Sequence, residues 1–370
     1  YICNRIDIVN SILNLQYQMK KYFIVASVCA TICGSLFISC KDNNAKNNTA
    51  ITEIVSKIEQ NKYKIGDKIS IPTASLEGIT KVVVSVDEQE VPADFTIDGK
   101  KIGLGNHTVN VKFFKGEEET NSRDFTFVVY ASDPAAQWNY EIVGTYPHNP
   151  DYFTQGFYFK NGDIYEGTGL REGKTRLIKY KLGSSEPIKL YQIKDDVFGE
   201  GITELDGSIY QLTWQDRAIY KYDLDFNQIA KLDMPSQVIE GWGITTIGNE
   251  LAITEGSQRI HFFDKDFKYL RTVQAFDNTQ PYSYLNEIEY HDGLIYANVY
   301  LKSGHADNSN IVVIDPQTGA VKGEFNFAEL KGKQGNPQAQ ELNGIAFKDN
   351  GNMLLTGKNW DKIFEIKIKK

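Results

Sequence analysis

Five tripeptides open five similar stretches of this chain: Gln155-Gly156-Phe157, Glu200-Gly201-Ile202, Trp242-Gly243-Ile244, Asn286-Glu287-Ile288 and Asn343-Gly344-Ile345. Each tripeptide is followed by a turn glycine and then by a second apolar strand. The turn glycines are Gly162, Gly207, Gly248, Gly293 and Gly351, and they are spaced by 45, 41, 45 and 58 residues. A period of this length without helical patterning predicts a β-propeller, in which each repeat forms one blade.

Each repeat also contains a later apolar run that predicts further strands. These runs are Leu177–Tyr180, Ile219–Tyr222, Ile260–Phe263, Ile311–Ile314 and Ile363–Ile366. Five blades of four strands fit residues 138–370, and the stretch from Tyr140 to Tyr146 could supply the last strand and close the ring. The composition is 41% hydrophobic and 12% aromatic, with aromatic and β-branched residues in the expected strands, which favours an all-β protein.

A smaller β-domain is expected before the propeller, over residues 51–131. It contains short alternating runs, namely Lys68–Ile71, Lys81–Val86, Thr108–Phe113 and Phe125–Tyr130, with turns at Asp98-Gly99 and Lys115-Gly116. This pattern resembles the immunoglobulin-like β-sandwiches of bacterial proteins. We expect a spacer, joined to the propeller by a linker over residues 132–137 and preceded by a flexible polar tether over residues 40–50.

The first forty residues predict export and lipidation. Met19-Lys20-Lys21 precede a mostly apolar run from Tyr22 to Ile38, which is short for a membrane span, and a small residue precedes Cys40. This pattern is typical of a lipoprotein signal peptide over residues 19–39, with Cys40 as the lipidated first residue of the mature chain. A plain signal peptide or a short anchor is the alternative. Residues 1–18 are then an upstream extension, and we expect a monomer attached to the membrane through Cys40 in the cell envelope, on the periplasmic face or the cell surface.

Cysteine use and charge exclude several functions. The four cysteines are Cys3, Cys29, Cys33 and Cys40, so cleavage leaves only the lipidated one and excludes a cysteine nucleophile, a disulfide or a thiolate metal site. Removal of residues 1–39 takes away three basic residues and one acid, which moves the formal charge from −8 to −10. No long basic patch remains, so nucleic acid is not an expected partner.

Two sets of equivalent positions point to a site at one end of the propeller channel. Two residues before the apolar residue of each innermost strand, the repeats carry different polar or aromatic side chains, namely Gln155, Glu200, Trp242, Asn286 and Asn343. At the end of the next strand they carry Gly169, Trp214, Gly256, Tyr300 and Lys358. We expect these two rings to face the same mouth, with the two glycines leaving room for a substrate to enter. Taken singly, each side chain could instead pack between blades or bond to backbone, but five different groups at one position favour a site.

Several ordered motifs carry a resemblance over residues 140–370. They are Phe153-Thr154-Gln155-Gly156-Phe157, Phe198-Gly199-Glu200-Gly201-Ile202-Thr203, Gln211-Leu212-Thr213-Trp214, Glu240-Gly241-Trp242-Gly243-Ile244-Thr245, Leu285-Asn286-Glu287, Ala297-Asn298-Val299-Tyr300, Leu342-Asn343-Gly344-Ile345-Ala346 and Thr356-Gly357-Lys358. Together they resemble the glutamine cyclotransferases of the plant and bacterial type. The resemblance implies a five-bladed propeller that cyclises N-terminal glutamine of peptides or proteins to pyroglutamate and releases ammonia.

Residue roles follow from the resemblance, motif by motif. It implies that Glu200 is the proton shuttle and that Asn286 and Lys358 are polar groups at the reacting amide. The implied substrate pocket consists of Phe153, Gln155, Phe198, Trp214, Trp242, Tyr300 and Asn343. The family usually has tryptophan where this chain has Tyr300, which changes the size and polarity of that wall.

The residue types at these positions also suit this reaction independently of the resemblance. A carboxylate can take up and return the proton of the attacking amine, and amide and ammonium donors can stabilise the oxyanion. No serine has the nucleophile-elbow sequence, and none is required.

Two other functions remain open from the residues alone. One is a non-catalytic, lipid-anchored propeller that binds a peptide or glycan, and the other is a metal-dependent lactonase-type propeller. The histidines His107, His148, His261, His291 and His305 show no paired ligand spacing, so no metal or other cofactor is expected to be required. Glu287 and Glu289 could hold a structural calcium in the channel, although carboxylates at i and i+2 are also typical of solvated or backbone-bonded groups.

Overall fold

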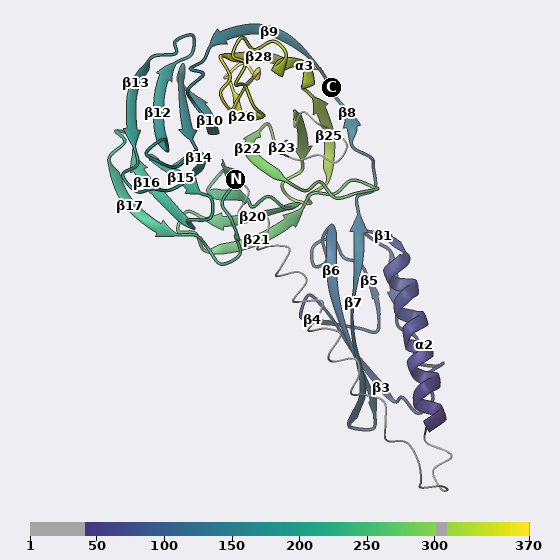
Figure 1. Cartoon of the computed structure of the whole chain (residues 1–370). Helices are drawn as coiled ribbons and strands as arrows, with labels where there is room; N and C mark the ends of the chain where they lie inside the picture. The colour runs from purple at the N-terminus through teal and green to yellow at the C-terminus, as the bar shows by residue number, and fades with distance from the viewer. Residues whose placement is uncertain (1–40, 301–308, 370) are drawn as a thin grey trace, which may run out of the picture. The chain divides into compact units, whose positions relative to one another are not determined.

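The computed structural model describes residues 41–300 and 309–369 (Figure 1). The expected upstream extension, the signal peptide and the lipidated Cys40 lie outside the described residues. Within the described part of the chain, no helix is long and apolar enough to span a membrane. Residues 50–370 form one compact unit.

The described chain begins with a helix, where the sequence predicted a tether and then a sandwich. Helix α2 extends from Lys41 to Gln60. Ile51, Ile54, Val55 and Ile58 recur at helical spacing, and Ile51 and Ile58 are buried in the core of the N-terminal domain. The prediction of an irregular segment up to residue 50 was therefore wrong, because the apolar stripe that starts at residue 51 stabilises a helix.

Two sheets complete the N-terminal domain. One contains, in spatial order, β1 (Lys62–Lys64), β7 (Glu118–Tyr130), β6 (Gly105–Lys115), β3 (Lys81–Val86) and β4 (Gln89–Val91). The other pairs β2 (Lys68–Ser70) with β5 (Asp94–Thr96). Buried residues alternate along β6, as expected for a sheet with one face on a core. The domain is therefore rich in β-structure, with the strands in the predicted stretches and an added helix.

Residues 136–369 form five further sheets within the described chain, each built on four antiparallel strands, and the fourth sheet has a short fifth strand that is described below. The first contains β10 (Thr154–Lys160), β11 (Asp163–Thr168), β12 (Arg176–Lys181) and β13 (Pro187–Gln192). The second contains β14 (Gly199–Leu205), β15 (Ser208–Thr213), β16 (Ala218–Asp223) and β17 (Gln228–Asp233). The third contains β18 (Ile244–Ile247), β19 (Glu250–Thr254), β20 (Arg259–Asp264) and β21 (Tyr269–Gln274). The fourth contains β22 (Leu285–His291), β23 (Leu294–Val299), β24 (Asn310–Ile314) and β25 (Val321–Asn326). The fifth contains β26 (Leu342–Phe347), β27 (Met353–Gly357), β28 (Lys362–Lys369) and β9 (Asn139–Pro147).

The five sheets close into a ring because the first strand completes the last sheet. Strand β9 pairs antiparallel with β28, which confirms the predicted contribution of residues 140–146. Each innermost strand contacts the next, and β26 contacts β10 (Figure 1). Strand β8 (Ala136–Gln137) also pairs with β25, so the last residues of the predicted linker belong to the fourth sheet. A short helix, α3 (Ala328–Lys331), follows β25.

Glycine in the repeated tripeptides allows neighbouring innermost strands to approach closely. A Cβ atom added to Gly156 would lie 2.3 Å from the backbone nitrogen of Ile202. A Cβ at Gly201 would lie 2.8 Å from the nitrogen of Ile244. Because real Cβ atoms do not approach backbone this closely, these positions require glycine.

The fourth repeat has Glu287 at the position that glycine takes in the other four. Its carboxylate accepts the backbone N–H of Ile345 at 3.0 Å. This side chain is buried near the ring axis, where it bonds to a strand of the neighbouring sheet. The fourth repeat therefore has a backbone-bonded acid at this position, where Gly156, Gly201 and Gly243 of other repeats approach the neighbouring backbone closely.

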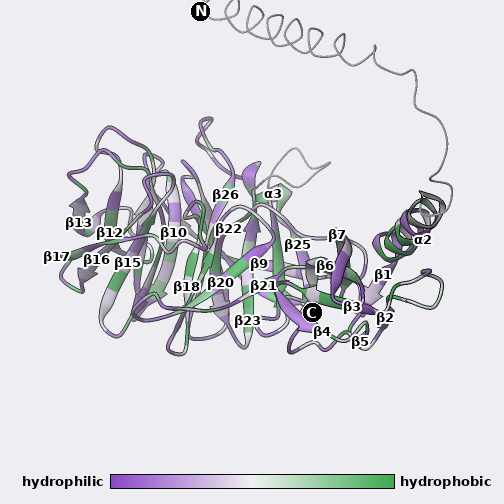
Figure 2. Ribbon diagram, turned by 90° about the horizontal axis from the view of Figure 1, so that it is seen from below, coloured by the Kyte–Doolittle hydropathy of each residue, from purple (hydrophilic) through white to green (hydrophobic). Residues whose placement is uncertain are grey.

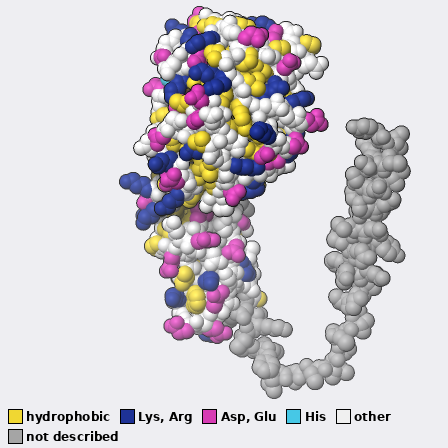
Figure 3. Space-filling model, turned by 90° about the vertical axis from the view of Figure 1, so that its left-hand side faces the viewer, with side chains coloured by type: hydrophobic (Ala, Val, Ile, Leu, Met, Phe, Trp, Pro, Cys, Tyr) yellow, Lys and Arg dark blue, Asp and Glu magenta, His cyan; other side chains and the backbone are white. Residues whose placement is uncertain are grey.

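Apolar side chains of adjacent sheets pack into shared clusters. Hydrophobic and hydrophilic residues alternate along the strands of the ring (Figure 2). The face shown in Figure 3 carries lysines and acids around a group of apolar side chains. Exposed apolar residues on the outer strands include Ile188, Leu190 and Ile229. Charges of both signs are mixed on this face.

The N-terminal domain and the ring share part of one core within the unit of residues 50–370. Phe276 and Ala320 of the ring belong to the same apolar cluster as the strands β3, β6 and β7. Gln274 accepts a hydrogen bond from the backbone N–H of Asn106 at 3.2 Å and donates one to its carbonyl at 3.0 Å. Removal of the domain would therefore expose apolar surface on the ring.

Candidate active site

The first set of predicted side chains lies where the innermost strands begin. Gln155, Glu200, Asn286 and Asn343 are each the second residue of their strands β10, β14, β22 and β26. All four are buried, and the strand pairing shifts register at each of these positions. Such irregularities re-aim side chains out of the regular alternation of a strand.

Three of these polar groups form a hydrogen-bonded series. Asn343 Nδ2 donates to Gln155 Oε1 at 2.6 Å, and Gln155 Nε2 donates to Glu200 Oε1 at 3.5 Å. The contact with Glu200 is long and therefore weak. The carboxylate of Glu200 thus has one weak neutral donor, Gln155, and keeps hydrogen-bonding capacity for a ligand.

Backbone hydrogen bonds place the second set of residues against the first. Trp214, Tyr300 and Lys358 follow the ends of β15, β23 and β27, and their N–H groups donate to the carbonyls two residues before Glu200, Asn286 and Asn343. The acceptor residues are Phe198, Tyr284 and Glu341, at 3.0, 2.9 and 2.9 Å respectively. The structure therefore brings the two predicted sets together at one end of the ring.

Aromatic side chains form a nearly continuous wall around the mouth. Phe153 meets Phe198 edge to face with the ring centroids 6.2 Å apart, and Phe198 meets Trp214 at 5.8 Å. Trp242 meets Tyr300 at 5.8 Å. Lys358 completes the wall, since its Nζ lies 5.1 Å from the ring centroid of Phe153 and 4.6 Å from that of Tyr300.

The two glycines of the second set do not leave an entrance, contrary to the prediction. A Cβ at Gly169 would lie 2.6 Å from the ring of Phe198, and a Cβ at Gly256 would lie 2.6 Å from the indole of Trp242. These aromatic rings already occupy the space that a larger residue would need. The glycines therefore allow the wall to pack, and Gly256 also has a φ of +78°, which favours glycine.

Glu200 and Lys358 are the two ionisable groups of the mouth that are most deeply buried. Burial raises the pKa of Glu200 well above its usual range, against the opposing effect of the Lys358 charge. Burial also lowers the pKa of Lys358, although Glu200 and Glu341 act in the opposite direction. Lys358 Nζ lies 3.9 Å from Glu341 Oε2. Because burial favours the neutral form of both Glu200 and Lys358, each can take part in proton transfer at moderate cost, which suits general acid–base chemistry.

Glu240 also lies in this mouth, although the sequence motifs predicted no role for it. Its carboxylate accepts the indole N–H of Trp214 at 2.6 Å and that of Trp242 at 3.3 Å. A signal was present, because Glu240 occupies the position that Phe153 and Phe198 take in the first two repeats. A carboxylate beside two indoles differs from that pattern.

Unpartnered amide oxygens provide further binding capacity. Among the described residues, the Oδ1 atoms of Asn286 and Asn343 are buried and have no hydrogen-bond partner. Buried polar atoms are normally paired, so such atoms in a site point to a ligand. An N–H group of a bound molecule would satisfy either oxygen.

Of the two acids proposed for calcium, Glu287 is buried and Glu289 is partly exposed. Burial and the nearby Glu289 raise the pKa of Glu287 well above its usual value, and burial raises the pKa of Glu289 to about 8. Glu289 accepts a hydrogen bond from Thr245 Oγ1 at 3.1 Å. In the part of the chain that the structure describes, no three His, Cys, Asp or Glu side chains gather into a group that could hold a metal ion.

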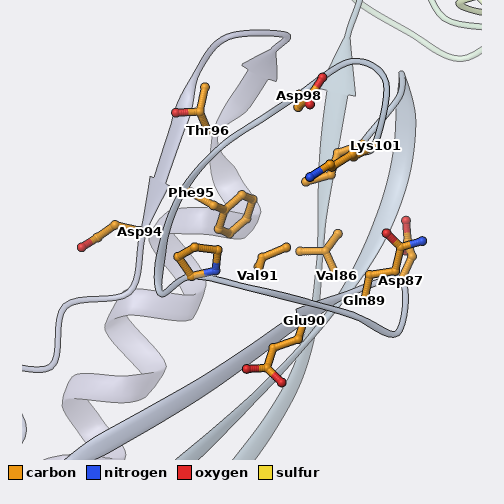
Figure 4. Close-up of a pocket in the computed structure, with 12 residues that line it drawn as sticks. Val86, Asp87, Gln89, Glu90, Val91, Asp94, Phe95, Thr96, Asp98 and Lys101 are labelled. Atoms are coloured by element: carbon orange, nitrogen blue, oxygen red, sulfur yellow. The ribbon is translucent and has the colours of Figure 1, made fainter.

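A hollow of about 420 Å³ lies in the N-terminal domain (Figure 4). Its floor includes Val86 and Phe95, and Asp94, Asp98 and Lys101 are among its other lining residues. Asp94 and Asp98 are exposed, so they lack the buried environment that perturbs Glu200 and Lys358. The mouth of the ring is therefore the better candidate for catalysis.

Comparison with known proteins defines the class to which this ring and mouth belong. Residues 117–368 match the glutamine cyclotransferase family, and the chain belongs to that family. A glutaminyl-peptide cyclotransferase from Arabidopsis thaliana is 31% identical over 241 residues, which cover 62% of this chain and 71% of the plant protein. The crystal structure of Myxococcus xanthus glutaminyl cyclase matches with a TM-score of 0.56 and 29% identity, covering 64% of this chain and 98% of the bacterial one.

Proposed function

We propose that this protein is a glutaminyl-peptide cyclotransferase that acts on peptides or proteins with N-terminal glutamine. One observation carries the proposal beyond family membership, namely a buried Glu200 that feels the charge of Lys358, whose Nζ lies over the aromatic ring of Phe153. Membership in an enzyme family favours catalysis over a propeller that only binds a peptide or glycan.

The reaction joins the α-amine of glutamine to the carbon of its own γ-carboxamide. The new C–N bond closes the five-membered ring, the bond from the same carbon to the amide nitrogen breaks, and that nitrogen leaves as ammonia. Glu200 takes the proton from the attacking amine and returns it to the leaving nitrogen. A positioned base of this kind contributes about 10²–10⁴-fold.

The other side chains stabilise and orient the reacting group. Lys358 and Asn286 lie at the reacting amide, where the ammonium and the amide N–H can donate to the developing oxyanion, at about 3–4 kcal/mol for one well-placed donor. Gln155 and Asn343 bind the polar part of the substrate. The aromatic wall holds the glutamine side chain folded, so that its α-amine lies close to its γ-carboxamide and the entropic part of the activation barrier falls. The wall consists of Phe153, Phe198, Trp214, Trp242 and Tyr300.

Ammonia release from a glutaminyl dipeptide is the direct test. The matched control is the same dipeptide with an acetylated α-amine, because it keeps the carboxamide but has no nucleophile. We expect ammonia and a pyroglutamyl product from the free dipeptide and neither from the acetylated one. Ammonia from both would indicate a simple amidase, and ammonia from neither would favour the binding function.

We also propose a finer description of the architecture and its attachment. The ring is a five-bladed β-propeller closed by β9, and the N-terminal domain is an immunoglobulin-like sandwich that serves as a spacer. Lipidation of Cys40 attaches the chain to a membrane of the cell envelope. Mass spectrometry of the N-terminal peptide after expression in a bacterial host tests the lipid, since an unmodified Cys40 at the mature terminus would contradict it.

Catalysis is proposed to require no metal, with at most a structural calcium near Glu287 and Glu289. The backbone hydrogen bond from Ile345 to Glu287 supports a structural role for that acid. Chelation followed by parallel measurement of turnover and unfolding tests the proposal. Loss of turnover in a protein that remains folded would contradict it, whereas loss of both would indicate the structural ion.

A further inference from the structure

The carboxylate of Glu240 ties together side chains that two different sheets supply. Its Oε2 accepts the indole N–H groups of Trp214 at 2.6 Å and Trp242 at 3.3 Å. Its Oε1 accepts Gln215 Nε2 at 3.0 Å. Trp214 follows β15 of the second sheet, and Trp242 precedes β18 of the third. One carboxylate therefore fixes the orientation of two aromatic walls.

The backbone that carries Glu240 is itself held in place. Arg217 Nη1 donates to the carbonyls of Val238 and Ile239, both at 2.6 Å. The N–H of Ile239 donates to Glu255 at 3.1 Å. A Cβ at Gly241 would lie 2.6 Å from the carbonyl oxygen of Thr213, so the chain after Glu240 packs directly on β15. Glu240 thus projects from a rigid segment, as a residue that positions others should.

Glu240 also acts electrostatically on Glu200. Burial tends to raise the pKa of Glu240, as does the charge of Glu255, but the hydrogen bonds from Gln215, Trp214 and Trp242 outweigh these effects and hold that pKa below its usual value. The resulting negative charge raises the pKa of Glu200, after burial and against Lys358. Because the pKa of Glu200 is raised and that of Glu240 is lowered, Glu200 can exchange a proton while Glu240 stays ionised.

We propose that Glu240 is a positioning residue of the reaction described above. It holds Trp214 and Trp242 as fixed walls around the glutamine chain and keeps a permanent negative charge near the proton-shuttling Glu200. The inference rests on the proposed function. A residue that merely anchors its loop would change stability but would leave the kinetics and the pH profile of the folded protein unchanged.

Two variants of the full chain separate the two effects, and a third is the control. Glu240→Gln removes the charge but keeps an acceptor oxygen, whereas Glu240→Asp keeps the charge but shortens the reach to the indoles. Glu186→Gln makes the same chemical change at an exposed position before β13. For each variant we would measure kcat and KM for a glutaminyl dipeptide across pH, together with the unfolding transition.

The expected results differ between the variants. E240Q should lose about 10–100-fold in kcat/KM, the scale of a lost charged hydrogen bond, and its acid limb should move to lower pH because a like charge near Glu200 is gone. E240D should lose kcat while its acid limb stays in place. E186Q should match the wild type in every measurement.

Wild-type kcat, KM and pH profile in a folded E240Q or E240D would overturn the proposal. Unfolding of both variants would also overturn it, because Glu240 would then be an anchor of the fold. Binding of a pyroglutamyl dipeptide, followed by tryptophan fluorescence, is measured in parallel. A wild type that binds but releases no ammonia would reject the proposed function, while weaker binding by E240D would still support the positioning role.

Discussion

Burial and opposite charge act against each other on Glu200 and Lys358. Burial raises the pKa of Glu200, and the Lys358 cation lowers it. Lys358→Met should therefore move the acid limb of kcat/KM to higher pH, because the group that favours the ionised carboxylate is gone. Turnover should also fall by about 10²–10³-fold, the scale of one lost oxyanion donor.

The matched control is Lys265→Met, which removes an exposed charge from the turn after β20. Both variants are measured on the same dipeptide as the wild type, so titration of the substrate amine is common to all three profiles. An acid limb that moved to lower pH in K358M would show that Lys358 does not stabilise the ionised Glu200.

Replacement of Glu200 itself tests the proton shuttle. Glu200→Gln keeps the size of the side chain and most of its hydrogen bonding, so a pyroglutamyl peptide should still bind. Turnover should fall by about 10²–10⁴-fold because the base is gone. Glu204→Gln changes the same residue type on the same strand, where it pairs with Lys160 at 2.6 Å, and should keep near-wild-type turnover.

Wild-type turnover in E200Q would assign the base elsewhere. Failure of E200Q to fold, with E204Q folded, would show that Glu200 is a structural tie between neighbouring sheets. Ammonia release and unfolding are therefore measured on the same preparations.

At this scale, periodicity could predict which residues converge but not how they contact one another. The register of the repeats gave the strand positions of Glu200, Asn286 and Lys358, because equivalent positions point the same way in every repeat, whereas their roles stay predictions. It misassigned Gly169 and Gly256, since a repeat pattern does not show which ring from a neighbouring strand fills the space above a glycine. Glu240 was missed although it takes the place of Phe153 and Phe198 in the repeat, because the pattern does not show that its carboxylate accepts the indole N–H groups of two tryptophans.

Among the structural elements, the connection after β9 contains a buried ion pair that fastens the ring. His148 Nε2 lies 3.1 Å from Glu166 Oε2, and both side chains are fully buried. The other ring nitrogen of His148 lies 2.7 Å from the carbonyl oxygen of Trp360. Tyr180 and Thr154 each donate to Glu166 at 2.7 Å. The first and fifth sheets are thereby joined through one histidine.

Replacement of His148 by alanine should lower the free energy of unfolding substantially. His148→Ala leaves Glu166 buried without its charged partner, and breaking a buried pair typically costs about 3–5 kcal/mol of unfolding free energy. The matched control is Lys189→Ala, which breaks a surface pair with Asp225 at 2.8 Å and should cost about 0–1 kcal/mol. Urea unfolding of both variants measures the difference.

The loss of unfolding free energy in H148A should depend on pH in one direction. Burial tends to lower the pKa of His148, but Glu166 and the carbonyl of Trp360 outweigh it and raise the pKa above 6.5. A group with a raised folded pKa stabilises fully below its unfolded pKa and loses that contribution as pH rises through the folded value. The penalty of H148A should therefore shrink as pH rises above 6.5, and a penalty that grew over that range would contradict the ion pair.

The strands were predicted correctly where apolar and polar residues alternate clearly or where the stretch belongs to one of the five repeats. Closure of the ring by residues 140–146 is confirmed because β9 carries its own strand signal and β28 offers an open edge. Helix α2 was missed because its polar first half hides the stripe that starts at Ile51. Strand β8 has only two residues and depends on the edge of β25, which no local pattern reveals.

For the whole molecule, the question is whether the ring can fold and act without the N-terminal domain. Every proposed site residue lies on the ring, and the Myxococcus xanthus enzyme is covered over 98% of its length by 64% of this chain. A truncation should begin at residue 132 rather than 138, because β8 pairs with β25. In addition, the backbone N–H of Trp138 donates to the backbone carbonyl of Glu324 at 2.9 Å.

We expect residues 132–370 to fold and to release ammonia with a kcat/KM close to that of the full chain. Their unfolding free energy should be lower, because Phe276 loses its contacts with Tyr130 and with the core of the N-terminal domain. Exposure of one such side chain costs about 1.5–3 kcal/mol. Residues 148–370, which lack β9, are the matched control and should not fold, since β28 would be left as an open edge.

Steady-state kinetics and urea unfolding of the two truncations decide between the arrangements. A folded 132–370 fragment without turnover would show that the N-terminal domain contributes to the active site rather than acting as a spacer. An unfolded 132–370 fragment would show that the shared core around Phe276 is essential to the ring. A folded and active 148–370 fragment would show that closure by β9 is dispensable, which would remove the physical reason for fastening that strand with the His148–Glu166 pair.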